Sequence, residues 1–356
     1  MRKPSLILAA LCLVTAPARA QDAAPESAPS PNAIIDMAPE KAWVRIPASD
    51  VLVMTLEPGP KGDARTVIIQ LMPVPFSQGW VENIRTFARA KWYDGITVNR
   101  VQDNYVVQWG DPNYDNPEAE GEARALPDGL RNVSERHYSV VLSRVPIPEN
   151  APSPIQTCAA EDTACLSKII DDAQAFRDQM RARQLRFPND PYSHQTRFAD
   201  GWPVATDLAS FQAWPVHCYG MVGVGRGYSP DTGSGAELYT VIGHAPRHLD
   251  RNIALVGRIV EGMEHLSSLP RGSGALGFYT EDEFGKRTPI VSVRIASDLP
   301  DADQPAFEYL STESDTFARY ADARANRRDP FFILPAGGAD ICNIPVPVRR
   351  TADAAE

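Results

Sequence analysis

The chain has 356 residues, of which 43% are hydrophobic, and a formal net charge of -10. Nucleic acids and anionic membranes select basic surfaces, so the acidic balance argues against both as ligands. No stretch reaches the roughly 20 apolar residues that cross a bilayer, so we expect no membrane span.

The N-terminus has the pattern of a cleaved export signal. Arg2 and Lys3 precede a short apolar run at 6–14, and Ala18-Arg19-Ala20 fits a small-x-small cleavage site. A buried N-terminal helix is the alternative. Cleavage removes three positive charges and brings the formal charge to -13. The pattern therefore predicts a secreted protein, located in the bacterial periplasm.

The first half of the chain contains strand and helix patterns. Residues 21–40 are rich in Ala, Pro and Ser, which is typical of a flexible lead-in. A Pro- and Gly-rich turn joins the first two predicted strands, and the second strand alternates its apolar residues. A helix with apolar residues at i, i+4, i+7 and i+8 comes next. The predicted strands are 51–56, 65–71, 97–101 and 105–108, and the helix is 80–90.

Residues 113–217 have many turn signals and little regular alternation. The exception is an amphipathic helix from Leu166 to Met180. Strand character then returns, and a short helix precedes a Pro-rich tail. Many short strands with Gly/Pro turns favour a closed β-barrel or a sandwich with helical additions. The later strands are 220–224, 237–242, 255–260 and 289–295, and the helix is 314–324.

Four cysteines remain after signal cleavage. An even number in an exported chain indicates two disulfides with three possible connectivities, and four free thiols are the alternative. We favour Cys158–Cys165, which closes a short loop, and Cys218–Cys342, which would join the tail to the core. No CxxC pair occurs, so neither a redox motif nor a zinc ribbon is expected.

Two blocks of sequence carry a family resemblance. The first, at 81–112, reads VENIRTFARAKWYDGITVNRVQDNYVVQWGDP. The second begins GMVGVGRGYSPDTGSGAELYTVIG at Gly220 and continues to HLDRN and VGRIVEGM. In order and local spacing they resemble cyclophilin-type peptidyl-prolyl cis/trans isomerases, over residues 50–112 and 215–295.

This resemblance implies a mainly β fold. The expected barrel is closed, cyclophilin-like, eight-stranded and antiparallel, with capping helices and a partly helical insertion. The expected organisation is a signal peptide at 1–20, a lead-in at 21–40, the barrel at 41–112 and 215–297, an insertion at 113–214, and a C-terminal extension at 298–356.

The resemblance also implies a site. Arg100 matches the catalytic arginine, and Gln108 matches the glutamine that hydrogen-bonds near the substrate backbone. Tyr105, Val106, Tyr239 and Leu249 match the apolar wall of the proline pocket. The substrate-binding set is completed by four departures from the family, namely Gly225, Arg226 and Glu237, which replace Ala, Asn and Gln, and His248, which replaces Trp. Asn99 and Trp109 replace the family's His and Gly outside this set.

Such an isomerase needs neither a cofactor nor a metal. His244 and His248 are four residues apart, but Pro246 between them argues against a helical metal site. The expected partners are proline-containing polypeptides, and the expected state is a monomer. Two alternatives remain, a cyclophilin-like module that binds proline segments with little catalysis, and a structural envelope protein whose insertion carries the function.

Overall fold

The computed structural model describes residues 28–114, 121–145, 163–165, 167, 168, 171 and 190–351. The predicted export signal, Cys158 and most of the predicted helix 166–180 lie outside the described residues. In the described part, no helix combines the length and hydropathy that a membrane crossing requires.

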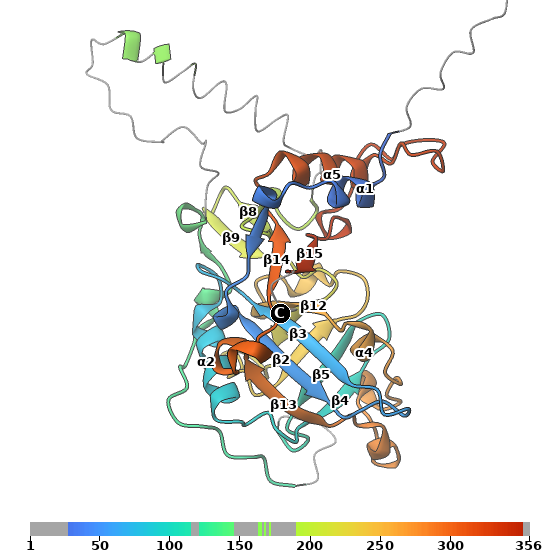
Figure 1. The fold of residues 1–356 in the computed structure, drawn as a ribbon. Coiled ribbons are helices and arrows are strands. Elements are labelled where there is room, and N and C mark those ends of the chain that lie inside the picture. Colours follow the sequence, from blue (N-terminus) through green and yellow to red (C-terminus); the bar gives the residue numbers. More distant parts are fainter. Residues whose placement is uncertain are drawn as a thin grey trace, which may run out of the picture.

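An antiparallel β-barrel forms the lower part of the molecule as drawn in Figure 1. Its strands are β2 (Val51–Leu56), β3 (Arg65–Leu71), β4 (Thr97–Val101), β5 (Val106–Gly110), β10 (Met221–Val224), β11 (Leu238–Val241), β12 (Leu255–Glu261) and β13 (Ile290–Ile295). Their order in the sheet is β13-β2-β3-β12-β10-β11-β5-β4. The edge strands meet, because Gly95 N and Ile96 O bond to Ile290 at 2.8 Å each. The sheet thus closes almost completely into the predicted eight-stranded barrel.

The side chains of strand β3 point alternately into and out of the barrel and contribute to two hydrophobic clusters. Val67, Ile69 and Leu71 point into the barrel and join its main hydrophobic cluster. Ile68 points outward and packs with Phe307 in a second cluster. Both faces of the strand are therefore covered, and the outer core attaches the C-terminal part of the chain to the barrel.

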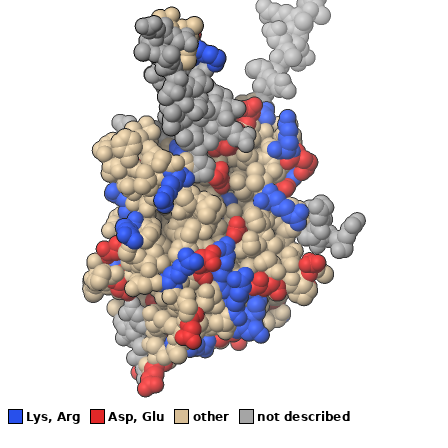
Figure 2. Space-filling view, turned by 90° about the vertical axis from the view of Figure 1, so that its left-hand side faces the viewer, with Lys and Arg blue, Asp and Glu red and all other residues tan. Residues whose placement is uncertain are grey.

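Helix α2 (Gln78–Arg89) packs against the barrel with the predicted apolar stripe. Trp80, Ile84 and Phe87 are fully buried in the main cluster. On the outer side, Arg85 forms ion pairs of 2.6 Å with Asp50 and Glu82. Acidic and basic side chains also lie next to one another on the surface shown in Figure 2, and fully exposed pairs of this kind contribute little to stability.

Two smaller sheets and two helices lie beside the barrel (Figure 1). One sheet has the order β1-β14-β15, and the other the order β6-β9-β8-β7. Helix α4 (Glu264–Ser267) follows β12. The bounds are β1 (Trp43–Arg45), β14 (Phe307–Leu310), β15 (Val348–Arg350), β6 (Val140–Val141), β7 (Gln195–Ala199), β8 (Trp202–Asp207), β9 (Gln212–Pro215), α1 (Pro31–Asp36) and α5 (Asp315–Ala325).

Helix α1 differs from the flexible lead-in expected at 21–40. Pro31 stands at its start, and Ser30 caps it by accepting a hydrogen bond from the Ala33 N–H. Ile34 is buried against Phe317 and Tyr320 of α5. This apolar contact stabilises the short helix α1, and the composition of the segment does not predict it.

Arg258 on β12 joins the barrel to the smaller sheets. Its Nη1 donates to Gly201 O at 2.7 Å, and its Nε donates to Gln70 Oε1 at 2.9 Å. The guanidinium stacks over Trp202, 4.5 Å from the ring centroid. Burial lowers the pKa of Arg258 to about 10. The side chain thus links β12, β3 and the turn before β8.

A disulfide joins Cys218 to Cys342 across 124 positions of sequence, which confirms this predicted pairing. Cys342 lies in a short 3-10 helix, Ile341–Asn343, so the bond connects the C-terminal segment to the residues just before β10. Cys165 is also in a disulfide. The predicted bond Cys158–Cys165 stays a prediction, because Cys158 lies outside the described residues.

Candidate functional site

A pocket of about 860 Å³ lies beside strands β4, β5 and β11. Its size is within the range of ligand pockets in proteins. The predicted residues that line it are Arg100, Tyr105, Val106, Gln108, Gly225, Arg226, Glu237, Tyr239 and Leu249. The other lining residues are Gly227, Tyr228, Ile253, Leu276 and Phe278.

Three acceptors hold the Arg100 guanidinium at this pocket. Nε donates to Leu276 O at 2.6 Å, and Nη1 donates to Gln108 Oε1 at 3.1 Å. Nη2 donates to Gln102 Oε1. Burial lowers the pKa of Arg100, while Tyr105 and Glu237 favour its charged form. The Arg100 guanidinium is therefore held in a fixed orientation and is partly shielded from water.

Gln108 connects this cation to a buried carboxylate. Its Nε2 donates to Glu237 Oε2 at 2.9 Å, while its Oε1 accepts from Arg100. Glu237 is 4% exposed. Because Gln108 separates the two charges, Glu237 supports Arg100 electrostatically without taking the guanidinium into a direct ion pair.

Aromatic and aliphatic side chains form the rest of the wall. The Arg100 guanidinium carbon lies 5.6 Å from the Tyr105 ring centroid and 5.4 Å from that of Phe278. Val106 and Tyr239 belong to one buried apolar cluster. A Cβ at Gly223 would lie 2.3 Å from the Tyr239 hydroxyl and ring, so a glycine at this position makes room for the tyrosine.

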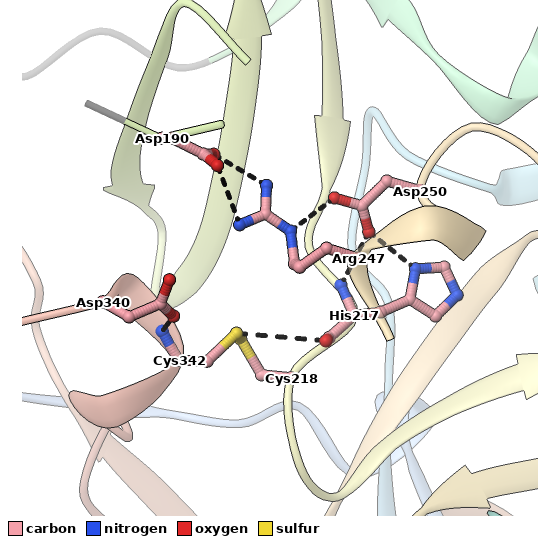
Figure 3. The surroundings of a disulfide bond; sticks show 7 residues. All are labelled: Asp190, His217, Cys218, Arg247, Asp250, Asp340 and Cys342. Atoms are coloured by element: carbon pink, nitrogen blue, oxygen red, sulfur yellow. Dashed lines mark hydrogen bonds and ion pairs between the residues drawn. A yellow bond between two sulfur atoms is a disulfide. The ribbon is translucent and has the colours of Figure 1, made fainter. Parts of the chain in front are cut away.

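A chain of buried charged and polar groups lies behind Tyr239. His217 Nε2 is 3.0 Å from the Tyr239 hydroxyl, and its Nδ1 is 2.8 Å from Asp250 Oδ1. Arg247 bonds Asp250 and Asp190 at 2.7 Å each. Figure 3 shows His217, Asp250, Arg247 and Asp190 beside the disulfide. In the neutral tautomer with a proton on Nδ1, His217 donates to Asp250 and accepts from the Tyr239 hydroxyl.

This arrangement predicts a pH dependence of stability. Burial lowers the pKa of His217, Asp250 raises it, and the charges of Arg247 and His248 lower it further, with a net lowering. The unfolded chain, with an imidazole pKa of about 6.5, then binds the proton more readily below that pH. We expect the free energy of unfolding to fall as the pH drops below about 6.5, by up to about 1.4 kcal/mol per pH unit from this group.

Urea unfolding measured between pH 7.5 and 5 tests this expectation. His217→Gln removes the titrating ring and should flatten the curve, whereas His137→Gln, at an exposed position, should leave its slope unchanged. Equal slopes for the wild type and His217→Gln would contradict the assignment.

The structure places some of the predicted residues in the lining of the pocket and others outside it. His248 is absent from the pocket lining, and its ring stacks beside Tyr105 with 6.3 Å between centroids. Asn99 and Trp109 are buried outside the lining, and Asn99 Nδ2 donates to Gly110 O at 3.1 Å. Of the departures from the family pattern, only Gly225, Arg226 and Glu237 line the pocket.

The segment at 272–280 supplies two residues that the sequence did not reveal. Tyr279 N donates to Asn99 O at 3.0 Å, and Phe278 forms a bridge with Arg100. This pairing carries Leu276 and Phe278 to the pocket. Their apolar character is the sequence signal that could have indicated a role in the pocket. The loop shows no periodic pattern that would have singled them out.

Comparisons with known proteins agree with this geometry. The family model described as "Cyclophilin type peptidyl-prolyl cis-trans isomerase/CLD" matches residues 77–297. The crystal structure of cyclophilin AquaCyp293 from Hirschia baltica aligns with a TM-score of 0.55 and 18% identity, over 86% of this chain and 93% of that chain.

A cyclophilin type peptidyl-prolyl cis-trans isomerase from Cryptosporidium parvum, crystallised in the presence of the dipeptide Ala-Pro, aligns with a TM-score of 0.33. Its identity is 10%, over 69% of this chain and 97% of that chain. No curated protein matches the sequence. Because the family model covers more than half of the chain, the chain belongs to the cyclophilin-type peptidyl-prolyl cis-trans isomerases.

Proposed function

We propose that this isomerase acts on exported polypeptides and that Arg100 provides its main transition-state contact. The observation that carries the proposal is the position of Arg100. Its three hydrogen-bonded nitrogens fix a guanidinium at the edge of a pocket whose walls include Tyr105, Val106 and Tyr239.

A fixed cation can accelerate rotation about an X-Pro bond. Rotation breaks amide resonance, and the barrier is roughly 18–20 kcal/mol. In the twisted transition state the imide nitrogen becomes pyramidal and gains a lone pair. A guanidinium N–H of Arg100 can donate to this lone pair, which the planar ground state does not offer, so the contact favours the transition state selectively.

The neighbouring groups support this step. The apolar wall takes the pyrrolidine ring and excludes water, which strengthens the electrostatic contact. Gln108 holds the guanidinium from one side and presents its amide to the same pocket, where it can steer the turning carbonyl. We assign Glu237 to keep Gln108 oriented through its 2.9 Å hydrogen bond.

Two features support an exported, periplasmic location. The first 20 residues have the signal pattern described above, and Cys218 and Cys342 form a disulfide of the kind found in oxidising compartments. Expression of the full chain in a bacterium, followed by fractionation and mass spectrometry, should find a mature form that begins at Gln21 in the periplasm. A cytoplasmic chain that retains Met1 or Arg2 would contradict this location.

An isomerisation assay tests the activity itself. The purified protein should accelerate cis/trans exchange of an X-Pro peptide, measured by protease coupling or by NMR exchange. Binding of the peptide without acceleration would favour the alternative, a cyclophilin-like module that holds proline segments. Absence of both binding and acceleration for all tested peptides would overturn the proposal.

A further inference from the structure

Arg226 is a second cation of the same pocket. It lies just beyond strand β10 and is partly buried. Its Nε donates to Asn252 O at 2.8 Å, and its Nη1 donates to Gly227 O at 2.7 Å. Both acceptors are main-chain carbonyls, so they orient the guanidinium without neutralising its charge.

The remaining N–H groups of Arg226 are available for a ligand. A guanidinium has five N–H donors, and the two bonds above use two of them. Among the described residues none accepts a hydrogen bond from Nη2, and no carboxylate forms an ion pair with this arginine. In Arg100 each of the three nitrogens already donates once to the protein, and the proposed function assigns a remaining N–H to the imide nitrogen.

The charged side chains that line the pocket also favour an anionic ligand. Among the described residues of the lining, Arg100 and Arg226 are basic and Glu237 is acidic, so the lining has more basic than acidic side chains. Glu237 is buried and hydrogen-bonded to Gln108. A positive pocket in a chain with a net charge of -10 attracts anionic groups locally while the protein as a whole repels them.

We propose that Arg226 makes this enzyme prefer clients with an Asp or Glu side chain close to the isomerising proline. The free Nη1 and Nη2 donors form a planar fork that matches the two oxygens of a carboxylate. The pocket of about 860 Å³ has room for residues beside the pyrrolidine ring, so both contacts can form on one peptide. The inference rests on the proposed activity and adds a substrate class to it.

Matched peptides test the preference. Each peptide carries one X-Pro bond, and one position within two residues of proline is varied among Glu, Gln and Lys, with blocked ends. We expect kcat/KM to be about tenfold higher for Glu than for Gln at one position, the effect of a charge-assisted hydrogen bond of about 1.5 kcal/mol. The ratio should shrink at high salt. Unblocked peptides show whether a C-terminal carboxylate acts in the same way.

Substitutions identify the residue responsible. The readout is the Glu-to-Gln ratio within each variant, so a change in absolute rate does not matter. Arg226→Gln should bring the ratio to about one, and Arg226→Glu should shift the preference to Lys. Arg251 offers a matched control, because this exposed arginine stacks over Trp214 and does not line the pocket. Arg251→Gln should keep the wild-type ratio.

Two results would overturn the inference while leaving the proposed activity intact. Equal rates for Glu and Gln peptides at every position would show that the pocket does not select carboxylates. A wild-type ratio in Arg226→Gln would assign the selection to another group. Failure of the proposed activity looks different, because the wild type would then accelerate none of the peptides.

Discussion

Arg100→Ala is expected to lower kcat/KM for X-Pro isomerisation by roughly 10²–10³-fold, the usual loss when one preorganised transition-state donor is removed. The reason is geometric, because the guanidinium is held by Leu276, Gln108 and Gln102 before substrate arrives. Alanine leaves the apolar wall in place but removes the donor to the imide nitrogen. The measurement is kcat/KM for one X-Pro peptide in the wild type and the variant.

Three controls separate catalysis from folding and binding. Circular dichroism and thermal unfolding show whether Arg100→Ala folds. The Kd of a proline peptide, measured by calorimetry, should change much less than kcat/KM, since the ring still enters the pocket. Arg45→Ala, at an exposed position of β1, should keep full activity. A folded Arg100→Ala variant with wild-type kcat/KM would reject the mechanism and favour a binding module.

Most of the barrel could be predicted because its strands have strong local patterns. Residues 51–56 and 65–71 are strands with the predicted bounds, and the predicted helix 80–90 corresponds to α2. Helix α2 buries one face against the barrel, so its apolar residues recur with the helical period, and the alternating apolar residues of strand 65–71 fill the barrel interior. The family resemblance then placed the strands in a barrel, which periodicity alone does not do.

The smaller sheets were missed for a physical reason. Residues 202–206 of β8 are all buried, so the strand shows no alternation of apolar and polar residues. Strands β1, β14 and β15 are only three or four residues long and come from distant parts of the chain. Their pairing depends on long-range contacts such as Ile68 with Phe307, which no local signal contains.

The predicted site residues are those with a counterpart in the family pattern, on strands and on loops such as that of Arg226, and the other lining residues were missed. Arg100 and Gln108 are on the paired strands β4 and β5, and the structure brings them to 3.1 Å. Tyr228, Leu276 and Phe278 come from irregular segments. His217 was missed because its role depends on Tyr239 and Asp250, which are distant in sequence and meet only after folding.

Removal of the Cys218–Cys342 disulfide has the largest expected effect on stability. The bond closes a loop with a sequence separation of 124. Chain-entropy theory gives about 5 kcal/mol for a loop of this length, and measured losses are typically 2–5 kcal/mol. We expect the double variant Cys218→Ala/Cys342→Ala to lose about 2–5 kcal/mol in its free energy of unfolding by urea. Alanine at 218 avoids placing a hydroxyl at a buried position.

The same variant separates stability from activity. All residues that line the pocket precede the C-terminal segment, the last of them being Phe278. The double variant should therefore retain most of its isomerase activity under strongly native conditions, while protease cleaves near residues 341–351 more readily. Reductant should destabilise the wild type more than the variant, because only the wild type has this bond to lose. An unfolding free energy within about 0.5 kcal/mol of the wild-type value would mean that noncovalent packing, such as that of Ile341 and Ile344, already holds the segment in place.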